Sequence, residues 1–373
     1  LMALGILDRP DSIGKPGAAG SAPEGRGRPL RAVFAWLKRW VAFPDRGLPW
    51  FPSALLRGLR ELRRGGYDLI FSTSPPATDH LVAAALQRLT GLPWVADLRD
   101  PWVRDQIDAT RTWRYLGRKL ERLTLRRASA IVTVSEPLAD ELREFHGDRK
   151  GGVICITNGF DPDDFNGDPR PSDDCFVITH TGLLAGLHRD PEVLVSVLEE
   201  LVEEGKASPD ELRLSLYGPP DPGLVKRRQG MAHPELLEIA GVVPRSEALA
   251  LQKASTVLLV VMADHPHWVR MHGGKVLEYL GAERPILVWS PAGGIIDELI
   301  EKTGAGAAVG DRESLKRTLE AWLAEFRETG GLAFKGDREE INRYRWDYLA
   351  ARFAGLFELV VGETGGARGR LRD

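Results

Sequence analysis

A short segment in the second half of the chain combines residue types that could bind a phosphate and a sugar. Gly273 and Gly274 come directly before residues with helical apolar spacing, and glycines let a turn approach an anion closely. The first amides of such a helix are free, and its positive dipole end favours negative charge. Lys275 adds a cation, and Glu278, about one turn further on, can accept hydrogen bonds from sugar hydroxyls. The pattern therefore predicts a phosphate-binding helix start within 272–280.

A plainer interpretation of the segment stays open, in which the glycines form an ordinary turn and Lys275 and Glu278 make a solvated pair on the helix surface. Three histidines also lie nearby: His265, His267 and His272. Their spacing does not match that of a defined zinc site, so we expect no metal there.

Short apolar segments alternate with helical patterns along most of the chain. Strands are expected at 67–73, 94–96, 130–134 and 153–156, and again, after a polar stretch, at 176–179, 212–216 and 256–261. Continuous apolar strands joined by helices indicate a parallel sheet covered on both faces. Because the alternation starts twice, we predict an α/β protein with two doubly wound, Rossmann-like domains facing across a cleft.

Composition sets the expected boundaries of these domains. Residues 1–28 are rich in Gly, Pro, Ala and Ser and are expected to form a disordered leader. A first domain is then expected at 29–165 and a second domain at 175–335, with a linker at 166–174. A C-terminal helix is expected at 336–362, followed by a tail at 363–373.

Further candidate residues follow from where the predicted strands end, because ligands of such sheets bind at the carboxyl ends of the strands. Gly218 follows the strand at 212–216, and Asp97 and Asp100 follow the strand at 94–96. The two aspartates could orient a substrate or accept its proton. A pair between Asp97 and Arg99, with Asp100 capping a helix, explains the same residues equally well.

Charge is unevenly distributed over the 373 residues. Residues 1–127 carry a net charge of +10 and the remainder carries −13, within a chain of net charge −3. A basic front half favours an anionic membrane surface or a lipid diphosphate as partner. Its densest run is Arg57, Arg60, Arg63 and Arg64, which also fits the solvated side of a helix whose other side is core.

The same composition excludes several classes of protein. No apolar run is long enough to span a bilayer, and the first residues do not form a signal peptide. Cys155 and Cys175 lie in or beside apolar strands, as buried reduced thiols do. We therefore expect a cytoplasmic protein, at most peripheral on the inner face of the plasma membrane, with no disulfide and no nucleic-acid partner.

The segment 272–280 and the apolar strand after it resemble the donor-site helix of the nucleotide-sugar-dependent glycosyltransferases called group 1 or family 4. Other segments resemble the same family in their order and spacing, at 71–76, 97–102, 132–137, 157–161 and 180–182. Together they cover most of residues 67–310. The resemblance implies the GT-B fold and transfer of a sugar from a nucleotide diphosphate sugar to an acceptor hydroxyl, with retention of configuration. It also implies that 29–165 is the acceptor-side domain, that 175–335 is the nucleotide-sugar-binding domain, and that the helix at 336–362 returns to the first domain.

The resemblance also assigns roles to single residues. In the family, the glycine-rich turn contacts the diphosphate and the helix glutamate binds the ribose, which places Gly273, Gly274 and Glu278 in those roles. Thr181 and Gly182 match the opening of the second domain. Arg189 is the candidate for the basic residue that meets the diphosphate and, with Lys275, steadies the leaving group.

No Asp-x-Asp pair stands convincingly at a strand end, since Asp161 and Asp163 read better as a turn. The donor is therefore expected to bind without a metal and without any bound cofactor.

Two features depart from the family pattern. Arg270 stands where the family motif has its first glutamate, which contacts the donor sugar. In addition, residues 1–28 show no counterpart of the family's N-terminal strand and glycine-rich loop, so we expect an incomplete first domain with a smaller sheet.

The resemblance suggests an acceptor sugar or lipid-linked glycan, in the synthesis of cell-surface polysaccharide or glycoconjugate. Two alternatives stay open. One is a sugar-nucleotide epimerase of GT-B build, which needs no acceptor. The other is a nucleotide-sugar-binding protein that has lost catalysis.

Overall fold

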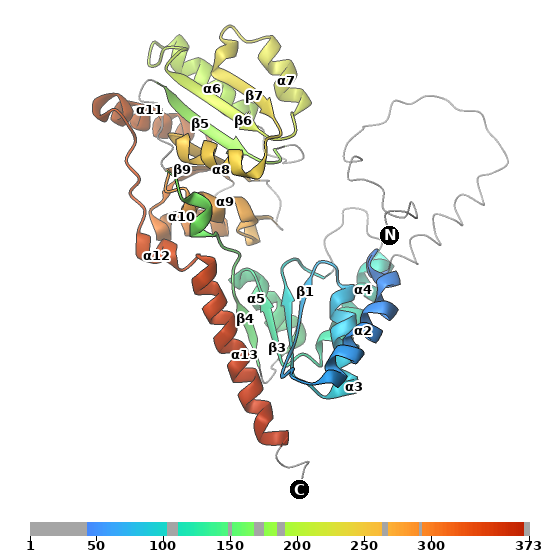
Figure 1. Cartoon of the computed structure of the whole chain (residues 1–373). Helices are drawn as coiled ribbons and strands as arrows, with labels where there is room; N and C mark the ends of the chain where they lie inside the picture. The colour runs from blue at the N-terminus through green and yellow to red at the C-terminus, as the bar shows by residue number, and fades with distance from the viewer. Residues whose placement is uncertain are drawn as a thin grey trace, which may run out of the picture.

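The computed structural model describes residues 43–102, 111–147, 151–167, 175–184, 191–262, 268–290 and 293–368. Within these ranges the chain forms two parallel sheets, each flanked by helices, and a long C-terminal helix (Figure 1). The predicted α/β fold with two doubly wound domains is confirmed. The expected leader at 1–28 and most of the expected linker lie outside the described residues.

The first domain is built on a four-stranded parallel sheet with the order β1-β2-β3-β4. Its strands are β1 (Ile70–Ser74), β2 (Trp94–Leu98), β3 (Ala130–Thr133) and β4 (Val153–Cys155). Its helices are α2 (Phe51–Arg64), α3 (Thr78–Thr90), α4 (Arg111–Leu125) and α5 (Glu136–His146). Trp94 on β2 packs toward α2 and α3, whereas Val95 packs toward the C-terminal helix, so β2 is covered on both faces.

The first strand begins later than predicted. Gly65 and Gly66, with φ of 80° and 85°, end α2, and Tyr67 is 50% exposed. Regular pairing starts only at Ile70, opposite Trp94, because the neighbouring strand begins there. The apolar run at 67–69 is therefore a connection and not part of the sheet.

The second domain is a six-stranded parallel sheet with the order β10-β9-β8-β5-β6-β7. Its strands are β5 (Phe176–Thr181), β6 (Leu212–Tyr217), β7 (Leu237–Gly241), β8 (Val257–Val261), β9 (Ile286–Trp289) and β10 (Gly306–Val309). Its helices are α6 (Glu192–Glu203), α7 (Pro222–Gln229), α8 (Arg245–Ala254), α9 (Gly273–Gly281), α10 (Ile295–Thr303) and α11 (Arg312–Thr329). The strand order reverses at β5, which lies between β6 and β8. Ligands of doubly wound sheets bind at such a switch point.

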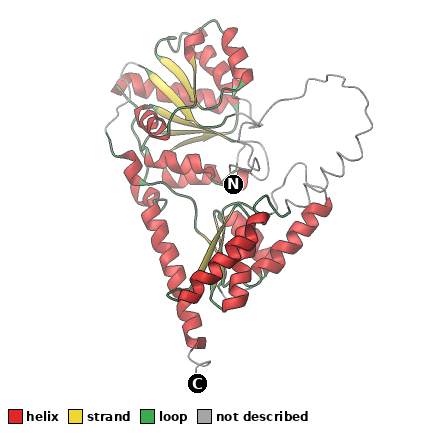
Figure 2. Cartoon of the chain, turned by 45° about the vertical axis from the view of Figure 1, so that its right-hand side comes forward, coloured by secondary structure: helices red, strands yellow, loops and turns green. Residues whose placement is uncertain are grey.

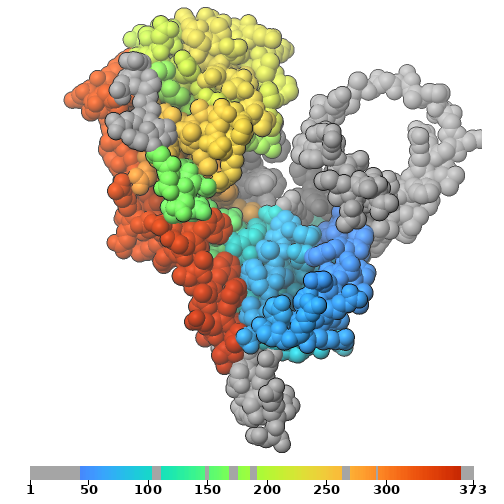
Figure 3. Space-filling model, in the orientation of Figure 1, coloured from blue at the N-terminus to red at the C-terminus, as the bar shows by residue number. Residues whose placement is uncertain are grey.

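The C-terminal segment returns to the first domain as two helices. These are α12 (Arg338–Asn342) and α13 (Trp346–Arg368), so the second one continues past the expected end at residue 362. Leu349, Leu356 and Val360 are buried against the first sheet, and Figure 3 shows the helix lying along the flank of that domain.

The two segments that cross between the domains also bind each other. The Phe160 amide donates to the Tyr344 carbonyl at 3.0 Å, and the Trp346 amide donates to the Phe160 carbonyl at 2.9 Å. A Cβ on Gly159 would lie 2.3 Å from the Tyr344 oxygen, so this close approach requires glycine. Figure 2 shows the two sheets as separate lobes joined along this side.

The turn predicted at 161–163 is present as the short helix η3 (Pro162–Phe165), whose start Asp161 caps by accepting from the Asp163 amide at 3.0 Å. None of the helices in the described parts of the chain is long and apolar enough to cross a bilayer.

Candidate functional site

The predicted phosphate-binding helix start is the N-terminus of α9. Gly273 has a φ of 60°, and no side chain of the described residues caps the helix. Among the described residues, a Cβ added at Gly273 or Gly274 would meet nothing within 4 Å. The first amides of α9 are therefore open to a ligand, as an anion site at a helix start requires.

Tyr279 fixes α9 against the end of β5. Its hydroxyl accepts a hydrogen bond from the Thr181 amide at 2.9 Å and lies 3.2 Å from the Thr181 hydroxyl. Burial raises the pKa of Tyr279 to about 12, so the hydroxyl keeps its proton. The sequence analysis did not single out this residue, although its place in the apolar stripe of α9 was a signal that it would be buried.

Three of the predicted residues meet where β5 and β6 end. A Cβ on Gly218 would lie 1.9 Å from the Gly182 carbonyl oxygen, and a Cβ on Gly182 would lie 2.6 Å from Lys275 Cε. Lys275 thus reaches from α9 across Gly182. The described parts of the loops after these strands enclose a cavity of only about 10 Å³ between them.

Glu278 belongs to a polar network on the same side of α9. Gln252, which is fully buried, donates from Nε2 to Glu278 Oε1 at 2.7 Å and to the Thr181 hydroxyl at 3.0 Å. Lys275 Nζ lies 3.6 Å from Glu278 Oε1, so the ion pair considered from the sequence is present. Arg245 approaches Glu278 Oε2 at 3.7 Å. The carboxylate is thereby fixed in orientation, with 22% of the side chain exposed.

Some of the predicted residues cannot be placed. Arg189, His265 and His267 lie outside the described residues, and their roles stay predictions. His272 is placed: burial lowers its pKa to about 4, and its ring pairs with the backbone of Val134 in the first domain. A neutral, buried imidazole of this kind supports the contact between the domains.

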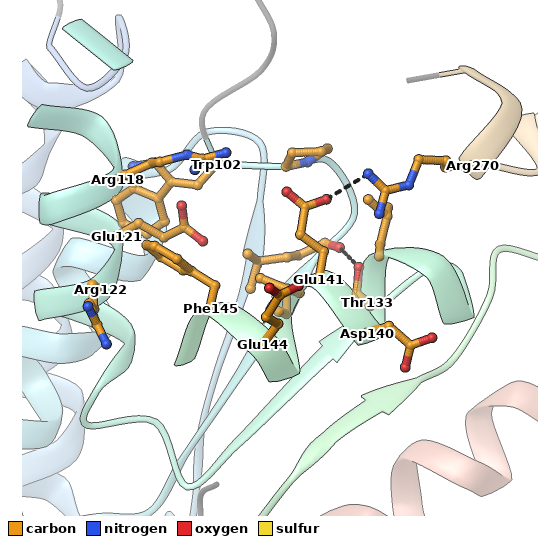
Figure 4. Close-up of a pocket in the computed structure, with 14 residues that line it drawn as sticks. Trp102, Arg118, Glu121, Arg122, Thr133, Asp140, Glu141, Glu144, Phe145 and Arg270 are labelled. Carbon is orange, nitrogen blue, oxygen red and sulfur yellow. Dashed lines mark hydrogen bonds and ion pairs between the residues drawn. The ribbon is translucent and has the colours of Figure 1, made fainter. Parts of the chain in front are cut away.

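A second concave region lies in the first domain, at the carboxyl ends of β2 and β3 and between α4 and α5 (Figure 4). Its volume is about 660 Å³. Apolar and charged side chains share its lining: Leu98, Pro101, Trp102, Arg118, Glu121, Arg122, Thr133, Leu138, Asp140, Glu141, Leu142, Glu144, Phe145 and Arg270. We call this region the α4–α5 cavity.

Within the α4–α5 cavity, Glu121 is a buried carboxylate, 6% exposed. Nε2 of His146, whose side chain is 1% exposed, lies 3.4 Å from Glu121 Oε1. The sequence analysis missed both residues. The available signal was that Glu121 shares a helical stripe with Gly117 and Leu125, which a solvated charge would not do.

Arg270 crosses from the second domain to this cavity. Its carbonyl accepts from the Ser135 hydroxyl at 2.8 Å, and its guanidinium donates to the Pro137 carbonyl at 3.2 Å and pairs with Glu141 at 3.1 Å. The residue that departs from the family motif therefore binds the first domain. It also links the α4–α5 cavity to the start of α9, three residues further along the chain.

The geometry of Asp97 agrees with the alternative interpretation, in which it pairs with Arg99. Asp97 is 2% exposed, and its Oδ2 accepts from the Thr73 hydroxyl at 2.9 Å and from Arg99 Nε at 2.8 Å. Burial raises the pKa of Asp97, while Arg99 acts against that rise. Its Oδ1 is buried without a hydrogen-bond partner among the described residues, so a role toward a substrate stays a prediction. Asp100 is half-buried beside the cavity-lining Pro101, and its role stays a prediction.

Residues 14–159 match the family described as the glycosyl transferase 4-like domain. No curated protein matches the chain in sequence.

Among solved structures, sucrose-phosphate synthase from Thermosynechococcus elongatus is similar at a TM-score of 0.60 and 17% identity, covering 85% of this chain and 80% of that one. A glycosyltransferase from Rickettsia africae ESF-5 is similar at a TM-score of 0.57 and 15% sequence identity. The match covers 83% of this chain and 81% of that one. A putative UDP-N-acetylglucosamine 2-epimerase from Listeria monocytogenes is similar at a TM-score of 0.52 and 13% sequence identity. The match covers 84% of this chain and 80% of that one.

At these identities the solved structures show the fold alone, and that fold is GT-B. The resemblance to the group 1 glycosyltransferases is confirmed in two respects: residues 14–159 match a glycosyl transferase 4-like family model, and the described residues have the GT-B fold.

Proposed function

We propose that this protein is a glycosyltransferase that moves a sugar from a nucleotide diphosphate sugar to an acceptor hydroxyl, with retention of configuration. The observation that carries the proposal is the open start of α9 at the switch point of the second sheet. There, free amides and Lys275 stand beside an oriented carboxylate, Glu278. Amides and a cation suit a diphosphate, and a carboxylate suits the hydroxyls of a ribose.

The proposed chemistry is stabilisation of a leaving group. Negative charge grows on the diphosphate as the glycosidic bond breaks, and the α9 amides with Lys275 stabilise that charge more in the transition state than in the ground state. Arg189 has the same role by resemblance. The proposal assigns the charge of the diphosphate to these protein groups and requires neither a metal nor a cofactor.

The acceptor is proposed to be a sugar or lipid-linked glycan, used in making cell-surface polysaccharide or glycoconjugate. The protein is proposed to bind peripherally to an anionic membrane through the first domain, whose α2 surface suits such a contact. Arg57, Arg60, Arg63 and Arg64 are all exposed on α2, and Trp50 and Leu56 are 49% and 57% exposed beside them. Aromatic and basic residues together are typical of surfaces that contact anionic lipid headgroups.

The test is donor binding by titration calorimetry with a panel of nucleotide sugars, comparing the wild type with Glu278→Ala. Loss of a charged hydrogen-bond acceptor should weaken donor binding by about 1–3 kcal/mol. Glu301→Ala, which removes an exposed carboxylate from α10, is the matched control and should change nothing. Equal affinities for wild type and Glu278→Ala would remove the ribose role.

An epimerase is the second candidate, because the fold is shared with a putative UDP-N-acetylglucosamine 2-epimerase. Incubation with labelled nucleotide sugars separates the possibilities. An epimerised donor formed without any acceptor supports the epimerase, and donor binding without turnover supports a protein that only binds nucleotide sugars. Transfer to an added acceptor supports the glycosyltransferase.

A further inference from the structure

A cavity of about 430 Å³ lies where the two segments that cross between the domains meet the end of α9. The first crossing segment contributes lining residues between 160 and 165, and the second contributes residues between 338 and 345. Residues 280–284, which end α9 and lead to β9, complete the lining together with Lys253 of α8. We call this region the hinge cavity. Its volume is in the range of small-ligand sites, and both connections between the domains line it.

The hinge cavity is strongly basic. Four cationic side chains and one carboxylate line it, giving a net charge of +3: Lys253, Arg284, Arg338 and Arg345 against Glu283. Neutral groups hold Lys253 in place, because its Nζ donates to the carbonyl of Phe165 at 2.7 Å and to that of Gly167. These contacts do not cancel the charge of the ammonium group. Cations gathered around one space repel one another, so an anion bound among them is stabilised.

Two of the arginines keep hydrogen-bond donors for such an anion. Arg338 donates from Nη2 to Glu283 at 2.9 Å. Arg345 donates from Nε and Nη2 to Asp347, which does not line the cavity. A guanidinium group has five N–H donors, so each arginine has donors beyond these pairs. Guanidinium groups match the geometry of phosphate oxygens, and the roughly two negative charges of a phosphate ester balance the excess better than one carboxylate does.

The hinge cavity is apolar inside and charged at its mouth. Phe160, Phe165 and Ile341 are 7%, 8% and 4% exposed, whereas the side chains of Arg338 and Arg345 are 76% and 35% exposed. A phosphate group held at the mouth leaves the rest of a ligand over apolar side chains. The lining therefore favours an organic phosphate over the bare inorganic ion.

Glu283 lies in an unusual turn at the edge of the hinge cavity. Its φ is 51°, and no other non-glycine residue in the described ranges has a positive φ. This left-handed conformation is unfavourable for a residue that has a Cβ. The turn brings the carboxylate to Arg338, so the end of α9 is tied to α12 beside the cavity. Glu283 is also the one lining charge that repels a phosphate.

The hinge cavity is separate from the candidate donor site, although α9 contributes to both. A Cβ on Gly281 would lie 2.5 Å from the Phe165 ring and 2.6 Å from the Phe160 ring, so α9 ends directly against the first crossing segment. Gly273 begins the helix at the candidate donor site. The nine residues of α9 span about 13 Å, and the two sites thus lie at opposite ends of one helix.

The position of the hinge cavity favours a ligand from solution over a lipid headgroup. Figure 1 shows α12, which lines the cavity, on the left of the molecule, and α2, with its exposed arginines, on the right. A membrane bound through α2 would therefore lie away from the hinge cavity.

We propose that the hinge cavity is a second phosphate site, which binds a small phosphorylated organic molecule from solution and thereby ties the two crossing segments together. This goes beyond the proposed function, because neither the donor nor the acceptor is assigned to this site. The site can be present whether or not the protein transfers a sugar.

The experiment uses the full chain and phenyl phosphate as the probe, in titration calorimetry at constant ionic strength. Phenyl phosphate should bind more tightly than inorganic phosphate because it covers the apolar wall, and phenol, which lacks the charge, should not bind. Arg338→Gln/Arg345→Gln should weaken phenyl phosphate binding about 10-fold or more through the loss of charged hydrogen bonds. Arg343→Gln is the matched control: Arg343 is exposed on the same segment, does not line the cavity, and its loss should change nothing.

Glu283→Gln tests the charge argument in the opposite direction. It removes the only lining carboxylate and releases Arg338, so phenyl phosphate should bind about threefold more tightly or better. Thermal unfolding of each variant without ligand checks that the fold is retained. Residues with a purely structural role would not change affinity in opposite directions, so weaker or equal binding by Glu283→Gln would contradict the proposal.

Hydrogen exchange of the wild type locates the bound probe without any substitution. The Phe160 and Trp346 amides donate between the crossing segments, and phenyl phosphate should slow exchange at 160–165 and 338–346. Slower exchange at 272–280 alone would place the phosphate at the candidate donor site and overturn the proposal. So would the absence of binding at millimolar concentration. If only vesicles containing phosphatidic acid slow exchange at 160–165 and 338–346, the phosphate belongs to a lipid and the assignment of a soluble ligand is wrong.

Discussion

Gly218 and Gly274 are both glycines of the candidate donor site, but only one of them is required by the packing of the protein itself. An alanine Cβ at Gly218 would lie 1.9 Å from the Gly182 carbonyl oxygen, so Gly218→Ala must push the ends of β5 and β6 apart. We expect a loss of about 1–3 kcal/mol in the free energy of unfolding, measured by chemical denaturation, together with weaker donor binding.

Gly274→Ala should separate stability from binding. A Cβ there meets nothing within 4 Å among the described residues, so the free energy of unfolding should stay level or rise by up to about 1 kcal/mol as helix propensity improves. The added methyl group occupies the space in front of the α9 amides, and calorimetry should therefore show weaker donor binding. Unchanged donor affinity would mean that the diphosphate does not contact the start of α9.

Burial lowers the pKa of three described histidines, His80, His180 and His272, and this makes stability depend on pH. Burial lowers the pKa of His80 to about 3 and that of His272 to about 4, whereas each titrates near 6.5 in the unfolded chain. The unfolded state thus binds protons more readily. Stability is highest above pH about 6.5 and falls as the pH drops toward the folded pKa values.

His272→Gln should remove one of these contributions. Each buried histidine lowers the free energy of unfolding by up to about 1.4 kcal/mol per pH unit in this window, so the variant should show a shallower slope between about pH 6.5 and pH 5. Urea denaturation at a series of pH values measures it. His233→Gln, at a half-exposed position, is the control, and a slope equal to the wild type's in His272→Gln would contradict the assignment.

At the scale of helices and strands, apolar periodicity predicted most of the elements because burial on both faces of a sheet leaves continuous apolar runs. The stripe of α13 was predicted in the same way, and its Leu349, Leu356 and Val360 are buried. Apolar periodicity could not predict contacts between residues that are far apart in the sequence. Glu121 meets His146 only because α4 packs beside α5, and Arg270 meets Glu141 only because two domains touch. Whether the charge of Asp97 faced a ligand or Arg99 depended on side-chain direction, which sequence spacing does not contain.

The bracing role of α13 gives a prediction at this scale. Leu349 is 1% exposed and packs against the first sheet, close to Gly159 in the crossing segment. Leu349→Ala should lower the free energy of unfolding by about 2–5 kcal/mol through lost burial and the cavity left behind. Leu359 on the same helix is 56% exposed, and Leu359→Ala should change stability by less than about 0.5 kcal/mol. Equal effects in denaturation would mean that α13 does not dock as described.

At the scale of the whole molecule, positive and negative charges are unevenly distributed along the chain, with a basic first part and an acidic remainder. Residues 1–127 carry +10 in a chain of net charge −3, so the basic residues are concentrated in the first part of the sequence. On α2, Leu55, Leu59 and Leu62 pack into the core, while Arg60 and Arg63 are exposed. The arginines thus occupy the solvated side of the helix, which leaves them free to meet an anionic surface.

Vesicle flotation tests whether this surface binds a membrane. The protein should float with vesicles containing acidic phospholipid at low ionic strength, and the bound fraction should fall steeply with salt, because exposed charges are screened within about 10 Å at 0.1 M. The double variant Arg60→Glu/Arg63→Glu should bind less. Lys226→Glu/Arg317→Glu makes the same change of charge in the second domain and should float like the wild type if α2 is the contact. If both double variants lose vesicle binding equally, the net charge of the protein alone attracts it to the membrane. If the wild type does not float, the arginines of α2 only form the solvent-facing side of that helix.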